Sequence, residues 1–466
     1  MAQSLPTPEG PHVHYPEGTG APEDEATAEA PEAVYGFPAG LWRALERRRP
    51  PGSGISERFR SPLRGPWLTS MFGSVLLIGL PIVIITGLLS YSAYGPQWGQ
   101  ALPADVGFLR LPHFQWPTRP SWLYQLTHGL HVGLGLILIP LVLAKLWSVI
   151  PKFFMWPPAR SVAQVLERIT LIMLVGGFLF EIATGVLNIQ YDYVFGFDFY
   201  AAHYYGAWVF MIGFVGHVVL KLPVMIRSLR SRSLRETLRT SRHDTVAEPR
   251  DDTELVAPQP GPATLSRRGA LSLVGGGTLL VAILTAGQTL GGVSRHAALL
   301  LPRGRSYGNG PNDFQINRTA QAAQIDPSMT GPQWKLTILG GPQPIMLDRA
   351  ALLAMPQHTA RLPIACVEGW STTQSWTGIR LIDLADLTGL RDITSATTTS
   401  LEKAGAFTTA ILAANQIRAS DSLLALQVNG ADLSLDHGFP ARVIVPAMPG
   451  VHNTKWVSSL KFTDQT

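Results

Sequence analysis

Five side chains in this sequence can bind metals and lie in unusual positions. Cys366 is the only cysteine among 466 residues, and it lies in the polar C-terminal part of the chain. His128, His131, His203 and His217 lie instead within long apolar stretches. A thiolate is a soft ligand for transition metals, and neutral imidazole is a common axial ligand of haem iron. Two separate metal centres are therefore the first hypothesis to consider.

The histidines belong to stretches that are long enough to cross a membrane. Hydrophobic residues make up 46% of the chain and charged residues only 15%, and the apolar residues concentrate in five segments. Each reaches the roughly 20 residues that a helix needs to span the hydrocarbon core. We therefore predict a transmembrane bundle of four helices followed by one separate helix. The segments are 67–95, 122–147, 169–189, 203–226 and 270–293.

The basic residues around these segments predict their orientation. Arginines and lysines gather before the first segment, between the second and third, and after the fourth, whereas the other two connections are poor in them. The positive-inside rule then places the N-terminus in the cytoplasm. We therefore expect a multi-pass protein of the inner (cytoplasmic) cell membrane. Because five spans are an odd number, everything after residue 293 is expected outside the cytoplasm.

This reading divides the chain into five regions. Residues 1–65 are predicted to be a cytoplasmic tail, disordered where Pro, Gly, Ala and Glu dominate. The fifth helix opens with "SRRGALSLVGGG" (266–277), which resembles a twin-arginine export signal; two ordinary positive-inside arginines are the alternative. The remaining regions are a four-helix membrane domain (66–230), a cytoplasmic basic stretch with a polar linker (231–266), the fifth helix (267–293) and a C-terminal domain (294–466).

The spacing of the histidines suggests how a haem would be held. His203 and His217 are 14 residues apart, so they lie on nearly one helix face and roughly 21 Å apart along the axis. We expect His131 with His203 to bind one haem near the outer face, and His128 and His217 are further candidates. Histidines that only hydrogen-bond between helices are the alternative. Glu181 is either a proton relay or another interhelical hydrogen-bonding group.

The four spans with these histidines resemble the membrane cytochrome b subunits of hydrogenases and formate dehydrogenases. The resemblance implies b haem and electron exchange with the membrane quinone pool. In that family two histidines on one helix commonly hold two stacked haems. Here the first and third spans contain no histidine, so His217 has no obvious partner. One haem is expected, and a second is left open.

The C-terminal region changes character and predicts a mainly β (α+β) domain. It is rich in Gly, Pro and Thr, with short strand-like runs separated by turn residues. The runs are 334–339, 423–430, 442–447 and 455–462. Taken alone, Cys366 is readily explained as a small buried hydrophobe. A free thiol in an exported domain is exposed to oxidation, however, which favours a functional role.

Two long motifs in this region resemble the sulfite oxidase family of molybdopterin domains. The first is "CVEGWSTTQSWTGIRLIDLADLTGL" (366–390), with Trp376, Gly378 and Asp383 at the family's positions. The second is "DHGFPARVIVPAMPGVHNTKWVSSLKF" (436–462). The resemblance covers residues 305–463. It implies a Mo-molybdopterin cofactor whose single protein ligand is Cys366.

The resemblance also assigns further residues to this cofactor. His437, Arg442 and Lys455 match the cradle for the pterin phosphate, and Asn317 and Arg318 match pterin contacts in the opening segment. Ordinary surface charges are the alternative. Glu368 and Trp370 follow the cysteine closely and are catalytic candidates beside Cys366. Trp370 and Trp376 either shape the substrate pocket or only pack.

One departure from the family bears on the substrate. Sulfite oxidases proper follow the cysteine with G-N-R-R, whereas this chain has Glu368, Gly369 and Trp370 there. A carboxylate in place of an arginine disfavours a doubly charged oxyanion. We therefore expect reduction of a small S- or N-oxide with electrons from the quinone pool. Sulfite-type oxidation and a non-catalytic binding or assembly module are the alternatives. No nucleic-acid partner is expected, and homo-oligomerisation is left open.

Overall fold

The computed structural model describes most of the chain after residue 58. The described residues are 59–94, 109, 111, 114–154, 161–190, 196–197, 199–251, 253–300, 307–404 and 408–464. The N-terminal tail predicted over 1–65 lies almost entirely outside them, so its disorder stays a prediction.

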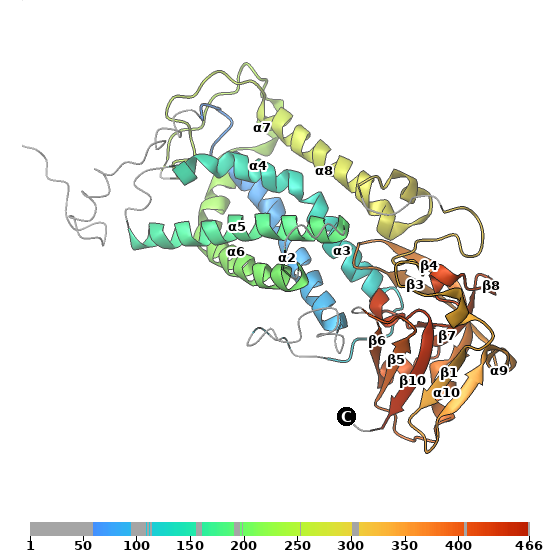
Figure 1. The fold of residues 1–466 in the computed structure, drawn as a ribbon. Coiled ribbons are helices and arrows are strands. Elements are labelled where there is room, and N and C mark those ends of the chain that lie inside the picture. The colour runs from blue at the N-terminus through green and yellow to red at the C-terminus, as the bar shows by residue number, and fades with distance from the viewer. Residues whose placement is uncertain are drawn as a thin grey trace, which may run out of the picture.

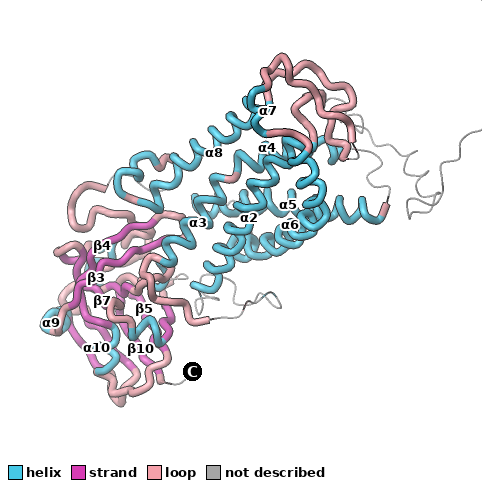
Figure 2. The backbone as a smooth tube through the Cα atoms, turned by 180° about the vertical axis from the view of Figure 1, so that it is seen from behind, coloured by secondary structure: helices cyan, strands magenta, loops and turns pink. Residues whose placement is uncertain are grey.

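Long apolar helices form a bundle that ends against a β domain (Figure 1). Helix α2 packs on α3, α4 and α6, and α5 packs on α6. Helix α8 lies along α3 and α4 on the outside of this bundle (Figure 2). The bounds are α2 (Pro66–Tyr94), α3 (Leu123–Ile137), α4 (Ile139–Val149), α5 (Val162–Gln190), α6 (Phe199–Arg230) and α8 (Arg267–Leu290).

Four of the described helices are long and apolar enough to cross a membrane, namely α2, α5, α6 and α8. The predicted second span is not one straight helix. It is broken at Leu138 into α3 and the α4 segment, which meet at 41°. Pro140 lies in the first turn of α4, where a missing N–H is tolerated but a preceding helix cannot continue unbent. Counted together, this bent pair is a fifth span, and the helices suggest membrane association.

The segment predicted as a polar linker contains structure of its own. It includes the short helix α7 (Leu234–Arg239), and its Glu248 is buried against the start of α2. The Trp67 N–H donates to Oε2 of Glu248 at 3.1 Å, which satisfies one of the free donors at the first turn of α2. The Arg267 Nη2 of α8 donates to the Val246 carbonyl at 2.9 Å. One arginine of the predicted export motif therefore has a structural role, and export itself stays a prediction.

The C-terminal domain is mainly β, as predicted, and contains two five-stranded sheets. In the first sheet the order is β2-β1-β10-β5-β6; in the second it is β3-β4-β7-β8, with β9 also paired to β7. The four strand-like runs of the sequence correspond to β1, β7, β9 and β10. The strands are β1 (Lys335–Leu339), β2 (Ile345–Asp348), β3 (His358–Ala365), β4 (Ser371–Arg380), β5 (Ser395–Ser400), β6 (Thr409–Ala413), β7 (Leu423–Val428), β8 (Ala431–Asp432), β9 (Arg442–Ile444) and β10 (Val457–Thr463).

Short helices and a large apolar core cluster complete this domain, with two smaller clusters beside it. The side chains of Leu336, Leu424 and Val443 come from both sheets and are fully buried in a single cluster. Trp116 and Tyr124, which precede and begin the second span, belong to the same cluster. The β domain is therefore packed directly on the helical part of the chain. The helices are α9 (Arg349–Ala354), α10 (Leu381–Asp386) and α11 (Ala414–Arg418).

Candidate functional site

Cys366 lies in a tight turn between two paired strands. Strands β3 and β4 are antiparallel, and their last pair is Ala365 with Ser371. The Cys366 N–H donates to the Trp370 carbonyl at 3.0 Å, and the Gly369 N–H donates to the Cys366 carbonyl at 3.0 Å. Gly369 has a φ of +88°, which glycine adopts without steric cost. The turn thereby fixes the direction of the thiol.

The thiol borders a cavity of about 290 Å³ in the β domain. Cys366 itself is only 6% exposed. Three of the residues assigned by resemblance, Asn317, Arg318 and Lys455, lie in the same wall. The other described lining residues are Val367, Ser400, Glu402, Gly450, Val451, Asn453, Thr454 and Trp456.

Glu368 contacts the Cys366 thiol, and Trp370 contacts Glu368. Oε1 of Glu368 lies 3.4 Å from the Cys366 sulfur, and the Trp370 indole N–H donates to Oε2 at 3.0 Å. Glu368 is fully buried, and neither residue is among the described residues that line the cavity. Trp376 is likewise buried, in a separate core cluster. The geometry gives Glu368 and Trp370 a positioning role beside the sulfur rather than direct contact with the cavity.

Two of the cations assigned by resemblance are buried: Lys455 lines this cavity, whereas Arg442 is not among its described lining residues. Burial lowers the pKa of Arg442 to about 9, although the charge of Cys366 opposes the shift. Burial also lowers the pKa of Lys455, and the charge of Arg442 adds to that effect. The Lys455 ammonium donates to the Asp436 carbonyl at 2.9 Å, and Nε of Arg442 has no partner among the described residues. Buried cations whose pKa values are lowered in this way are stabilised by an anion, such as a pterin phosphate.

His437 has a different setting from the one expected of a phosphate contact. Its ring stacks on Phe314 with centroids 3.7 Å apart, and its Nε2 lies 2.9 Å from the Asn312 carbonyl. Burial first, and the Arg442 charge second, lower the pKa of His437 to about 3. A neutral His437 ring contributes no cation for a phosphate. Its backbone carbonyl accepts a hydrogen bond from Nη1 of Arg442 at 3.3 Å.

Glu402 is a cavity residue that the sequence did not reveal. Its carboxylate pairs with Arg318 at 2.5 Å, and burial raises its pKa. Glu402 lies just beyond β5, outside both motifs, in a stretch without any signal that would separate it from a surface glutamate. The pairing neutralises much of the charge of Arg318 at this wall.

The turn that contains Cys366 rests directly on the helical bundle. Nε2 of His128 lies 3.1 Å from the Val367 carbonyl oxygen. From α8, the Thr289 hydroxyl donates to the Gly369 carbonyl at 2.9 Å. A Cβ at Gly369 would approach Val132 of α3 to 2.7 Å, so the turn and the helix are in close contact.

A second cavity, which we call the near cavity, lies inside the bundle next to this turn. Its volume is about 250 Å³, and its lining includes His128, His131, His203 and Glu181 together with Val367 of the β domain. The rings of His131 and His203 have centroids 6.1 Å apart. Two imidazoles that share one metal with bonds of about 2 Å would have nearly this separation.

The hydrogen bonds of these histidines separate their roles. His131 Nδ1 lies 2.9 Å from the Val83 carbonyl, so this nitrogen holds the proton and Nε2 keeps its lone pair for a metal. His128 uses both nitrogens, on Val367 and at 3.5 Å from the Ser90 hydroxyl. His131 is therefore better suited than His128 to bind iron.

His203 is held by its neighbours on α5. Its Nδ1 lies 2.8 Å from the Thr184 hydroxyl, and its Nε2 lies 3.2 Å from Glu181. Glu181 thus contacts a histidine across two helices, and it would have to release Nε2 before that nitrogen could bind iron. His217 lies in another cavity, farther from the β domain. Among the described residues no group of three or more His, Cys, Asp or Glu side chains is arranged to bind a metal ion.

Comparisons with known proteins identify the C-terminal domain. Residues 322–466 match the family described as oxidoreductase molybdopterin binding domain. An uncharacterized oxidoreductase, YuiH of Bacillus subtilis, is 30% identical over 135 residues, which cover 28% of this chain and 67% of that protein. The chain belongs to this family of molybdopterin-binding oxidoreductases.

Sulfite oxidases and nitrate reductases are among the other relatives that match this domain. The mitochondrial sulfite oxidase of Mus musculus is 30% identical over 159 residues, 28% of this chain and 29% of that protein. The NADH nitrate reductase of Ulva prolifera is 32% identical over 108 residues, 21% of this chain and 12% of that protein. The matched part is therefore under a third of these two enzymes. The cytochrome b resemblance of the bundle stays a prediction.

Proposed function

We propose that this protein is a membrane-bound molybdopterin enzyme that exchanges electrons with the quinone pool through b haem in the near cavity. Cys366 would hold molybdenum, Arg442 and Lys455 would balance the pterin phosphate, and His131 with His203 would hold the haem. When bound, the molybdenum cofactor supplies oxygen-atom transfer with a two-electron change, and haem carries single electrons. The chain would bind and orient both groups.

The observation that supports this proposal best is the position of Val367. This residue follows Cys366 directly, and it lines both the Cys366 cavity and the near cavity. The two candidate cofactor cavities therefore share one wall residue. Because both cavities lie in one chain and share this wall residue, we favour electron transfer between their cofactors over two unrelated binding sites.

The preferred reaction is the reduction of a small S- or N-oxide. The oxide takes two electrons and two protons and leaves as the reduced compound and water. The turn after Cys366 contributes no cation for an oxyanion, and Arg318 in the cavity wall is already paired with Glu402. The alternative, sulfite-type oxidation with quinone reduction, gains support from the buried cations Arg442 and Lys455 if no pterin phosphate needs them.

Metal analysis of the purified full-length protein tests the proposal. We expect one molybdenum per chain and a b-type haem spectrum after expression in a host that makes the pterin. A protein without molybdenum would be the non-catalytic module instead. A substrate screen with reduced viologen dyes and with quinones then decides between oxides and sulfite, because an oxide oxidises the reduced dye whereas sulfite reduces the quinone.

A further inference from the structure

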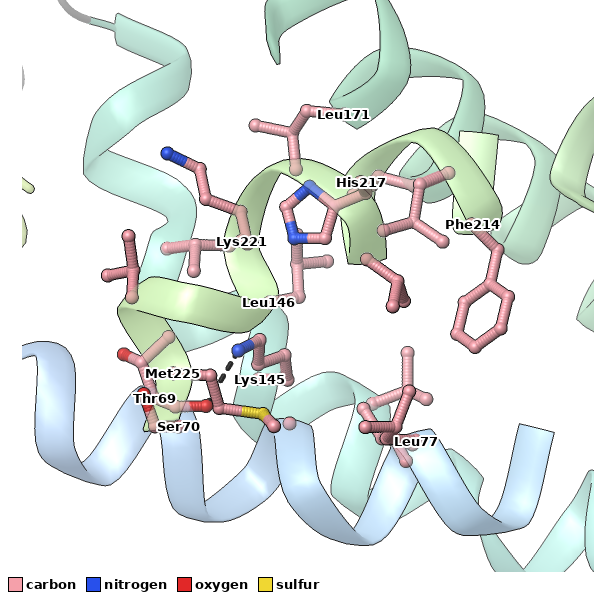
Figure 3. A pocket seen from close by; sticks show the side chains of 18 of the residues that line it. Thr69, Ser70, Leu77, Lys145, Leu146, Leu171, Phe214, His217, Lys221 and Met225 are labelled. Carbon is pink, nitrogen blue, oxygen red and sulfur yellow. Dashed lines mark hydrogen bonds between the residues drawn. The ribbon is translucent and has the colours of Figure 1, made fainter. Parts of the chain in front are cut away.

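The bundle contains another cavity, which we call the far cavity, at the end away from the β domain. Its volume is about 190 Å³, and its walls come mainly from α2, α4, α5 and α6, with Lys152, Thr253 and Leu255 from outside these helices. His217 and Lys145 enter it from α6 and α4 (Figure 3). Most other lining side chains are apolar, so a largely apolar ligand with a few polar atoms fits it.

The far cavity repeats the near cavity at a spacing of 14 residues. His203 and His217 are 14 residues apart on α6, and His131 and Lys145 have the same separation on α3 and α4. On α2, Gly87 faces His131 and Gly73 faces Lys145; a Cβ would approach these side chains to 2.8 and 3.0 Å. The helices α6 and α2 and the bent pair of α3 and α4 therefore each have matching positions at the near cavity and at the far cavity.

Two differences make the far cavity unsuitable for a second haem. Lys145 stands where the repeat places His131, and its ammonium donates to the Thr69 carbonyl at 2.6 Å. A charged lysine has donors only and no lone pair for iron. On α5, Gly185 lies against His203, whereas Leu171, 14 residues earlier, fills the matching place beside His217 (Figure 3).

The polar side chains of the far cavity suit a ligand ring with oxygen atoms at its edge. Nδ1 of His217 is buried and has no hydrogen-bond partner among the described residues. At the cavity wall, Glu167 pairs with Lys221 at 2.7 Å and with Lys152 at 3.3 Å. The cavity thus combines a donor at Lys145, a free imidazole nitrogen and a carboxylate able to exchange protons.

We propose that the far cavity binds the head group of a membrane quinone, with its oxygens at Lys145 and His217. In the direction of oxide reduction, a quinol gives up two electrons and two protons, and its two C–OH groups become C=O. The electrons pass toward the near cavity and reduce the oxide, whose reduction consumes two protons and releases water. The two quinol protons leave to Nδ1 of His217 and to the Glu167 carboxylate. This inference rests on the proposed function and names its quinone site.

Direct binding tests the proposal without relying on turnover. The full-length protein in lipid nanodiscs is titrated with a short-chain naphthoquinone, and haem per chain is counted in the same samples. We expect Lys145→Met and His217→Phe each to raise Kd at least tenfold, or about 1.4 kcal/mol. Lys335→Met and His243→Phe are matched controls at exposed positions, and they should leave Kd unchanged.

Each outcome has one meaning. Unchanged Kd in both cavity variants overturns the proposal, and so does the loss of one haem equivalent in either of them, because the cavity would then hold haem. A protein that binds naphthoquinone in this way but contains no haem retains the quinone site and contradicts the proposed function instead. If a variant fails to fold, an azidonaphthoquinone on the unaltered protein decides: cross-links to α4 and α6 around 145 and 217 support the site, and cross-links confined to the near cavity refute it.

Discussion

Nε2 of His128 in α3 lies 3.1 Å from the carbonyl oxygen of Val367, the residue next to Cys366. The same ring stacks on Tyr124 with centroids 5.2 Å apart and lies 6.5 Å from His131. His128 therefore connects the helix of a candidate haem ligand to the turn of the candidate molybdenum ligand. Metal binding through Nε2 of His128, one of the options that the sequence left open, would require this contact to break.

Replacing His128 by Phe should loosen the turn while keeping the stack on Tyr124. The lost hydrogen bond is worth about 1 kcal/mol, so the backbone amides of 366–371 should exchange hydrogen several-fold faster. Mass spectrometry of peptides from this turn measures the effect. Ser90→Ala, which removes only the contact at Nδ1, is the control. Equal exchange in His128→Phe and the unaltered protein would show that the contact does not hold the turn.

Replacing Gly369 by Ala tests the close approach of the turn to α3. A Cβ there would meet Val132 at 2.7 Å, and the φ of +88° adds strain. Gly389→Ala is a matched control, since its φ is +74° but nothing lies within 4 Å of its Cβ. An alanine held at a positive φ is strained, which lowers the free energy of unfolding by on the order of 1 kcal/mol or more. Both variants should therefore have a lower melting temperature. The additional drop in Gly369→Ala measures the contact between the turn and α3, and equal drops would refute it.

Much of this arrangement could be predicted from the sequence, because its signals are local. The length of the apolar stretches predicted the helices. Two motifs and the opening segment predicted the molybdopterin domain, and the structure brings Cys366, Arg318 and Lys455 to one cavity. What could not be predicted depends on contacts between distant segments. The pairing of Glu402 with Arg318 and the contact of His128 with Val367 both join residues that no sequence pattern links.

Replacing Cys366 by Ser should remove molybdenum and leave haem in place. A hydroxyl is a harder and less readily ionised ligand than a thiol, so it should not retain the metal. Elemental analysis measures the molybdenum content, and the optical spectrum of the same preparation measures the haem. Molybdenum at the unaltered level would contradict the ligand assignment.

Replacing Arg442 by Met should weaken pterin binding without destabilising the cofactor-free protein. Burial of this charge is unfavourable without an anion, so its removal should leave the melting temperature of cofactor-free protein unchanged or raise it by a few degrees. Pterin content after purification should fall several-fold. Arg418→Met is the control, because Arg418 donates to the Ile393 carbonyl away from the cavity. A normal pterin content in Arg442→Met would exclude Arg442 from the cradle.

His437 should make the stability of the β domain depend on pH. Its pKa is lowered from 6.5 to about 3 in the folded protein, chiefly by burial. Between these values the unfolded chain binds a proton that the folded chain does not. The free energy of unfolding must therefore fall as the pH falls from 6.5 toward 3, by at most about 1.4 kcal/mol per pH unit for this one group. His437→Gln cannot titrate, so its melting temperature should change less over this range, although it loses the stack on Phe314 and starts from a lower value at pH 7. Parallel pH profiles for the two proteins would show that another group controls the acid transition.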